Sequence, residues 1–296
     1  MLKMLKRIKD KLYYYLAEKN WGVRREYGAY VDAHQEEHVK APWKHWWLLI
    51  RLNWHYRILR KKTPLLSARE LSVESEAFER PTAAQFAKDL SEYDVISFDI
   101  FDTLILRPFP QPSDLFEIVG VRLGIANFRE IRINAERDAR AEAIALNGND
   151  EVTIYDIYKR VSKRTGIDMN AGVETELAAE KEYCFADPYM KEVYEILLDL
   201  GKEIVITSDM YIPHDSMEGL LSECGYAGYK KLYVSCDYRC SKHSGGLFER
   251  LVSEHKGRKI IHIGDNYVSD FESAKKSGIA AKLYHGSHLE AVKTAC

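Results

Sequence analysis

The feature that most constrains this chain is a short apolar run that ends at a carboxylate. Residues 95–98, Val-Ile-Ser-Phe, carry mostly the β-branched and aromatic side chains of a buried strand. Asp99 follows directly, and Asp102 comes three residues later. Parallel sheets in α/β proteins place their chemistry at the carboxyl ends of the strands. Asp99 is therefore the first candidate functional residue of the chain.

Four further strand patterns occur later in the chain, and helical patterns separate them. These strands are expected at residues 204–208, 231–236, 259–263 and 279–284. Between the strands lie amphipathic stretches, such as the one that begins at Pro188 and stops at Gly201. Strands that alternate with helices predict an α/β fold with a Rossmann-like parallel sheet and right-handed crossovers.

A long helical stretch interrupts this alternation after the first strand. Three prolines within residues 108–112 lead the chain out of the sheet. From Ser113 to Ala186 the pattern is helical, with Ser113 and Thr153 as expected N-caps and a last helix at 174–183. No strand signal is strong in this stretch. An insertion of this kind after one strand is typical of a helical cap.

The first part of the chain differs from the rest in charge and composition. Residues 1–62 carry 15 Lys and Arg against 6 Asp and Glu, whereas the other 234 residues carry 28 against 39, and all five tryptophans lie in this first part. Residues 1–20 predict a basic amphipathic helix, and residues 43–62 combine Trp with Arg and Lys. We therefore predict three parts: a basic, Trp-rich helical N-terminal extension at 1–80, an α/β core at 93–111 with 187–296, and a helical cap at 112–186.

The N-terminal helices have three open interpretations. Trp with Arg and Lys on an amphipathic helix is the composition of a segment that lies at a membrane interface. The same surface would fit docking onto a partner protein, and packing onto the chain's own core is the third alternative. No groove-reading motif is recognisable, so nucleic acid is not expected as a partner.

Cysteine usage and hydropathy predict a cytoplasmic setting. The five cysteines are odd in number and irregular in spacing, which argues against a disulfide framework. Cys236 and Cys240 have no second pair, so no metal site is expected there. No signal peptide and no apolar run of about 18 residues is recognisable. We expect a reduced cytoplasmic protein, held at the inner face of the membrane if residues 1–62 bind lipid; the sequence does not predict the oligomeric state.

Polar residues follow several of the predicted strands. They are Asp99 after the first strand, Ser208 after the second, Lys242 ahead of a helix, and Asp265 and Asp270 after the fourth. All would open onto the same edge of a parallel sheet. A single acidic residue after a strand is more often a helix cap, so the functional argument depends on the ordered set.

This ordered set resembles the motifs of the haloacid dehalogenase superfamily, whose members are mostly phosphatases. The four motifs are matched, in order, by Phe98-Asp99-Ile100-Phe101-Asp102-Thr103-Leu104, by Ile204 to Ser208, by Lys242 with Phe248 six residues later, and by Gly264-Asp265 with Asp270. The resemblance covers residues 93–285. It implies a helical cap at the insertion point after the first motif.

The resemblance implies a Mg²⁺-dependent phosphohydrolase that acts on a small phosphorylated metabolite. Asp99 would be the nucleophile that forms an aspartyl-phosphate. Ser208, with Thr207 as the alternative, would donate a hydrogen bond to the phosphoryl oxygens, and Lys242 would neutralise their charge. The ligands of Mg²⁺ would be oxygen atoms from Asp99, the main-chain carbonyl of Phe101, Asp265, and Asp270 either directly or through another group.

One position departs from the family pattern. Family phosphatases usually carry a second Asp two residues after the nucleophile as general acid/base, and here that residue is Phe101. Asp102, one position further on, is the nearest substitute. An aromatic residue also occurs there in the family's dehalogenases, but these need no paired carboxylates for Mg²⁺, so Asp265 and Asp270 favour phosphate chemistry. The alternative is a catalytically weak scaffold that docks a partner or a membrane through its N-terminal helices.

The surroundings of the first motif add two expectations. Residues 97–107 resemble a branch often encoded with glycosyltransferases of bacterial surface-polysaccharide synthesis, which implies a sugar or glycerol-type phosphate as substrate and a glycosyltransferase as a contact of residues 1–62. Arg107 is expected to face solvent, with a substrate anion as the alternative partner. His262, inside a buried strand, is expected to be a hydrogen-bonded core residue.

Overall fold

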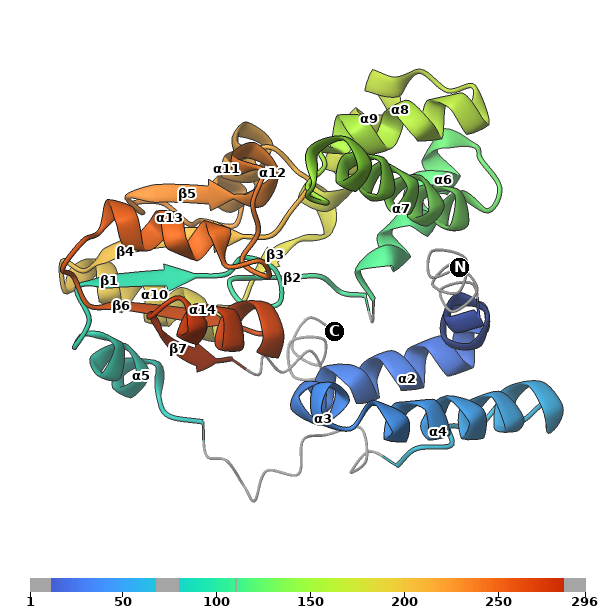
Figure 1. The fold of residues 1–296 in the computed structure, drawn as a ribbon, viewed down its shortest axis with the longest axis horizontal. Helices are drawn as coiled ribbons and strands as arrows, with labels where there is room; N and C mark the ends of the chain where they lie inside the picture. The colour runs from blue at the N-terminus through green and yellow to red at the C-terminus, as the bar shows by residue number, and fades with distance from the viewer. Residues whose placement is uncertain (1–11, 68–79, 110, 285–296) are drawn as a thin grey trace. The chain divides into compact units, whose positions relative to one another are not determined.

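The computed structural model describes residues 12–67, 80–109 and 111–284, and Figure 1 shows their fold. The chain divides into two compact units, Met1–Arg80 and Pro81–Cys296. Each unit has a hydrophobic core of its own. Much of the basic helix expected at residues 1–20 lies outside the described residues. Every helix within the described ranges is too short or too polar to span a bilayer.

The N-terminal unit is helical, and its core includes one face of the helix at residues 42–53. Its elements are the π-helical turn η1 (Tyr14–Glu18), the helices α2 (Trp21–Ala33), α3 (Gln35–Lys40) and α4 (Pro42–Asn53), and the π-helical turn η2 (Trp54–Ile58). The Asn20 side chain caps α2 by accepting the N–H of Val23 at 3.1 Å. Pro42 occupies the first turn of α4, where its missing N–H costs no helical hydrogen bond. The core of this unit consists of Ala17, Val23, Tyr27, Leu48, Leu49, Leu52 and Leu66.

The second unit contains a five-stranded parallel sheet, which confirms the predicted α/β fold. Its strands, in the order in which they lie side by side, are β5 (Lys231–Val234), β4 (Glu203–Ser208), β1 (Val95–Phe98), β6 (Ile260–Gly264) and β7 (Ala280–Leu283). The strand expected at 231–236 is shorter than predicted, because the chain turns into the short helix α12 (Ser235–Tyr238). The central place of β1 puts Asp99 between the ends of β4 and β6.

Helices cover both faces of the sheet, as its continuous apolar strands require. Ile96 and Phe98 pack toward α5 (Ala83–Leu90), α10 (Pro188–Asp199) and α11 (His214–Glu223). Val95 packs on the opposite face, toward α13 (Gly246–Glu254) and α14 (Ser273–Lys276). The helix α10 starts at Pro188 as predicted, and Gly201 follows its end with a left-handed φ of 68°.

Four helices form the cap between β1 and β4. They are α6 (Leu115–Leu123), α7 (Phe128–Asn147), α8 (Ile154–Thr165) and α9 (Met169–Tyr183), after the 3₁₀ turn η3 (Pro112–Asp114). The chain enters and leaves the cap through an antiparallel ribbon of β2 (Ile105–Leu106) and β3 (Phe185–Ala186). Strands of two residues are too short to leave a periodic pattern, which is why the sequence did not predict them.

Three expected helix starts in the cap can be compared with the structure. Thr153 caps α8 as predicted, since its hydroxyl accepts the N–H of Asp156. The expectation for Ser113 is wrong, because its hydroxyl accepts a hydrogen bond from Arg129 at 2.7 Å and caps no helix. The last cap helix begins at Met169 rather than at 174, and Asp168 is its N-cap.

The core of the N-terminal unit contains a neutral histidine. His45 is buried, and neither of its ring nitrogens has a hydrogen-bond partner among the described residues. His38 packs edge-to-face on it, with ring centroids 4.1 Å apart. Burial, with a smaller contribution from His38, lowers the pKa of His45 from 6.5 to about 4. Between about pH 4 and 6.5, His45 is therefore protonated in the unfolded chain and neutral in the folded unit.

We predict that acid destabilises the N-terminal unit through His45. The stabilising effect of a neutral His45 is complete above pH 6.5 and is lost as the pH falls toward 4. Urea unfolding followed by tryptophan fluorescence, which reports on this unit alone, should show about 1–2 kcal/mol less stability at pH 5 than at pH 7. His45→Leu should reduce this difference, whereas the control His214→Gln in the other unit should keep it. Equal pH dependence in native protein and His45→Leu would contradict the assignment.

Candidate active site

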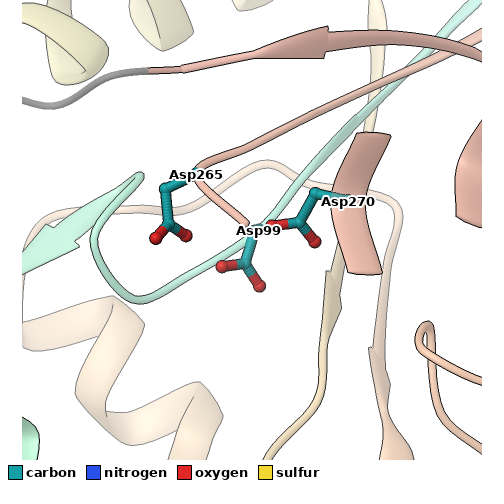
Figure 2. Close-up of side chains that lie close together, drawn as sticks. All are labelled: Asp99, Asp265 and Asp270. Carbon is teal, nitrogen blue, oxygen red and sulfur yellow. The ribbon is translucent and has the colours of Figure 1, made fainter. Parts of the chain in front are cut away.

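Three carboxylates converge at the carboxyl edge of the sheet. Asp99 directly follows β1, Asp265 directly follows the neighbouring strand β6, and Asp270 lies in the π-helical turn η4 (Tyr267–Glu272). Each offers an oxygen, and these oxygens lie within 4.8 Å of one another. Figure 2 shows the three side chains gathered at one place. Asp99 and Asp270 are buried, so little water reaches the cluster.

The turn after β6 is shaped to bring Asp270 to this cluster. Asn266 accepts the N–H groups of Val268 and Ser269, both at 3.0 Å, which caps the start of η4. Asp270 accepts the N–H of Asn266 at 2.9 Å, so the turn closes back on itself. A Cβ at Gly264 would lie 2.4 Å from the carboxyl carbon of Asp270. The glycine of this motif therefore makes room for the carboxylate.

Lys242 is the cation of the cluster. Its Nζ lies 2.5 Å from Asp99 Oδ1 and 2.6 Å from Asp270 Oδ1, and the residue is 2% exposed. Its backbone is held by Asp209, which accepts the N–H of Lys242 at 2.6 Å and that of His243 at 3.1 Å. Sequence reasoning gave Asp209 no role, although it directly follows β4, the same signal that marked Asp99.

Burial and the crowding of like charges shift the pKa values of this cluster. Burial raises the pKa of Asp99 to about 7, with Lys242 opposing the shift and Asp270 adding to it. Burial and the neighbouring carboxylates, Asp99 foremost, raise the pKa of Asp265 well above its usual value. Burial opposes ionisation of Asp270 too, but Lys242 and His262 hold its pKa below the usual range. Burial opposes the charge of Lys242, but Asp270 and Asp99 raise its pKa, so it stays an ammonium ion.

This donor set fits a hard divalent cation. When all three carboxylates are ionised, they and the Lys242 ammonium leave a net negative charge that one divalent cation would neutralise. Mg²⁺ prefers oxygen ligands, and the three carboxylate oxygens lie close enough together to share one ion. Asp99, Asp265 and Asp270 would hold it. The main-chain carbonyl of Phe101 stays a predicted ligand.

A buried chain of hydrogen bonds ties the cluster to the interior of the sheet. His262 Nε2 lies 3.2 Å from Asp270 Oδ1, and His262 Nδ1 lies 2.8 Å from Ser97 Oγ. Ser97 Oγ in turn lies 2.9 Å from Thr207 Oγ1. The expectation that His262 is a hydrogen-bonded core residue is confirmed. The Thr207 hydroxyl is already bonded inside the sheet, which leaves Ser208, buried at the end of β4, as the predicted phosphoryl donor.

Asp102 lies in the sharp turn that follows the nucleophile position. Its φ is 58°, in the left-handed region, and its N–H donates to the carbonyl of Ile105 at 2.8 Å. The charge of Asp102 contributes to the raised pKa of Asp265. Asp102 therefore lies near enough to the cluster to influence its protons.

Arg107 does not face solvent, so that expectation is wrong. It is 5% exposed, and its Nε and Nη2 donate to Glu180 Oε2 and Oε1, both at 2.9 Å. Its guanidinium carbon lies 3.8 Å from the centroid of the Phe101 ring. Burial opposes its charge, but Glu180 holds the pKa of Arg107 above its usual value. Phe101, the residue that departs from the family pattern, is thus packed against an ion pair that joins the loop after β2 to the cap helix α9.

A cavity of about 280 Å³ lies beside this ion pair, between α9 and α11. It is lined by Leu177, Glu180, Lys181, Ile212, Asp215, Ser216, Gly219 and Leu220. None of the three clustered carboxylates lines it. The cavity therefore belongs to the seam between cap and core rather than to the acidic cluster.

We predict that the ion pair of Arg107 and Glu180 contributes strongly to stability. Glu180→Gln leaves a guanidinium buried without its counter-ion and should lower the free energy of unfolding by about 3–5 kcal/mol in urea titrations. The matched control on the same helix is Glu182→Gln, whose partner is Arg122 at 2.9 Å on an exposed surface. That control should cost less than about 1 kcal/mol. Equal effects of the two substitutions would contradict the prediction.

This chain was compared with family models, with curated proteins and with solved structures. No family model matches the chain, and no curated protein matches it either. The structure of a 2-haloacid dehalogenase from Pseudomonas syringae pv. tomato DC3000 has a TM-score of 0.50 and 16% sequence identity with this chain, covering 69% of this chain and 99% of its own.

Two further solved structures are similar. The HAD-hydrolase YfnB of Bacillus subtilis, bound to magnesium, has a TM-score of 0.48 and 14% identity, covering 64% of this chain and 87% of its own. The HAD-family enzyme BT-2542 of Bacteroides thetaiotaomicron, in a mutant complex with magnesium and inorganic phosphate, has a TM-score of 0.47 and 13% identity, covering 66% and 95%. At such low sequence identities, the similarity between these structures and this chain is a similarity of fold. The unit of core and cap has the fold found in a haloacid dehalogenase, in agreement with the resemblance of its motifs.

Proposed function

We propose that this protein is a Mg²⁺-dependent phosphohydrolase that acts on a small phosphorylated metabolite through an aspartyl-phosphate. The observation that carries the proposal is the buried cluster of Asp99, Asp265 and Asp270 with Lys242 between two of its carboxylates. Such a cluster can hold a divalent cation and receive a dianionic phosphoryl group at the same edge of the sheet. Phosphoryl transfer requires mainly positioning and neutralisation of charge, which these groups supply.

The proposed reaction has two steps, both at Asp99. A carboxylate oxygen of Asp99 attacks the phosphorus of the ester, the bond to the ester oxygen breaks, and the alcohol leaves with a proton from a general acid. Water then attacks the phosphorus of the aspartyl-phosphate, which releases inorganic phosphate and restores the carboxylate. Lys242 balances negative charge on the phosphoryl oxygens, and Ser208 donates a hydrogen bond to them. Bound Mg²⁺ would supply further charge neutralisation.

The general acid is proposed to be Asp102, since Phe101 cannot transfer a proton. Asp102 lies in the turn directly after the nucleophile and influences the pKa of Asp265. The substrate class is proposed from the cap and from the resemblance of residues 97–107. A helical cap over the site favours small molecules because it excludes macromolecules, and the resemblance favours a sugar or glycerol-type phosphate.

We predict that phosphate release requires both Asp99 and Mg²⁺. A panel of sugar, glycerol and other small phosphate esters should yield inorganic phosphate with native protein, and Asp99→Asn or chelation should reduce release to background. The exposed Asp199→Asn is the matched control and should keep full activity. Mg²⁺ should also raise the melting temperature of the native protein, because it stabilises the folded state that binds it. Asp265→Asn should weaken this effect.

Three outcomes would overturn the proposed function. Full phosphate release by Asp99→Asn would exclude Asp99 as nucleophile. No release from any ester, together with no thermal effect of Mg²⁺, would favour the alternative of a catalytically weak scaffold. Halide release from 2-haloacids in the absence of Mg²⁺ would reassign the site to dehalogenation.

We predict that Asp102→Asn lowers kcat by about 10²–10⁴-fold if Asp102 is the general acid. Asn tolerates the left-handed conformation that Asp102 adopts, so the turn should keep its shape. The loss should be largest for esters with a basic leaving alcohol and small for aryl esters such as p-nitrophenyl phosphate, whose leaving group needs no proton. A uniform loss across both kinds of ester would show that Asp102 shapes the turn and does not transfer the proton.

A further inference from the structure

The helix α4 and the turn η2 that continues it carry two apolar faces. The inward face supplies His45, Leu48, Leu49 and Leu52 to the core of the N-terminal unit. The opposite side carries a second row, here called the tryptophan face, made of Trp43, Trp47, Ile50, Trp54 and Ile58. Successive members are three or four residues apart, so they share one side of the helix. Their side chains are 54–68% exposed.

Such a row is unusual for a helix that already packs on a core. Surface helices of globular proteins are apolar on one face and polar on the opposite one. Single exposed apolar residues are common and need no explanation, as with Val121 and Leu146 on the cap. The tryptophan face is instead a continuous row. From Trp43 to Trp54 it extends about 16 Å along the helix. Contiguous apolar surfaces of this kind mark interaction sites.

The charges around the tryptophan face identify the kind of partner. No acidic residue occurs between positions 41 and 67 of the sequence. Arg51 follows Ile50 directly and is exposed, and residues 60–62, Arg-Lys-Lys, extend beyond Ile58 and are exposed as well. Cations that border a row of large apolar side chains complement an anionic surface that has an apolar interior. A bilayer with anionic headgroups has both properties, and tryptophan favours its interface.

We propose that the tryptophan face docks on the surface of a lipid bilayer that contains anionic lipids, with α4 lying along the plane of the membrane. The apolar side chains enter the boundary between headgroups and acyl chains, while the flanking cations contact the headgroups. The proposal concerns the N-terminal unit and does not depend on the chemistry proposed for Asp99. It assigns this unit the role of holding the second unit, with its cap and core, at a membrane surface.

The first test uses the full chain and vesicles of defined composition. Cosedimentation should show binding to vesicles of phosphatidylcholine mixed with phosphatidylglycerol, and weaker binding to phosphatidylcholine alone. All five tryptophans lie between residues 21 and 54, so their emission reports on this unit only. Emission should shift to shorter wavelength on binding, because exposed indoles leave water. Added salt should weaken binding, since part of the attraction is electrostatic.

Variants distinguish binding through the tryptophan face from nonspecific binding by exposed apolar side chains. The combined substitution Trp43→Ser, Trp47→Ser and Trp54→Ser should reduce the partition onto anionic vesicles by about tenfold or more. The matched control, Val121→Ser with Leu146→Ser, removes exposed apolar side chains from the cap and should bind as the native chain does. Replacing Arg60, Lys61 and Lys62 by Gln should weaken binding to anionic vesicles and leave the weak binding to neutral ones unchanged.

Other occupants of the tryptophan face give different results, and each would overturn the proposal. If a second copy covers the face, the native chain is a dimer by light scattering, the triple Trp variant is a monomer, and neither binds vesicles. If the second unit of the same chain covers it, tryptophan emission is already at short wavelength without lipid and does not change. Equal binding by the native chain and the triple Trp variant would assign lipid contact to another surface. Circular dichroism of each variant checks that it is folded.

Discussion

The site depends on one buried ammonium group that serves two carboxylates. Lys242 lies between Asp99 and Asp270 in a place with little water, where a charge is tolerated only when it is paired. The surrounding elements keep this arrangement in place. Asp209 holds the backbone of Lys242 from the end of β4, and His262 contacts Asp270 from inside β6. Burial raises the pKa of Asp99, and Asp270 adds to that shift while Lys242 opposes it, so one ammonium does not fully offset the cost of burying these carboxylates.

Sequence reasoning predicted the sheet and the acidic cluster because both follow from local rules. A buried strand is visible in a run such as 95–98, and the parallel arrangement then brings the residues after each strand to one edge. What it missed are contacts between distant residues. Arg107 meets Glu180 across 73 positions, and nothing in the sequence near either residue shows the pair. Asp209 was visible as a residue after a strand, but its contact with the Lys242 backbone depends on a loop whose shape the sequence does not reveal.

The aromatic residue at the usual acid/base position has a structural consequence in this chain. The ring of Phe101 gives the guanidinium of Arg107 a flat apolar surface, while Glu180 from the cap satisfies its charge. A carboxylate at position 101 would compete with Glu180 for that guanidinium and would weaken the link between the cap and the loop after β2. The Phe101 ring and the buried ion pair therefore depend on each other. If the site hydrolyses phosphate esters, the proton has to come from a neighbour such as Asp102.

In the N-terminal unit, the needs of folding do not account for the exposed tryptophans. Leu48, Leu49 and Leu52 already give α4 the apolar face that a core needs. Trp43 and Trp47 on the opposite side add nothing to that core, and their exposure favours association rather than solubility. The proposed docking on a bilayer accounts for their presence. No acidic residue occurs between positions 41 and 67, whereas Arg51 and residues 60–62 are exposed cations. The proposed surface therefore carries negative charge and has an apolar interior within reach of the indole rings.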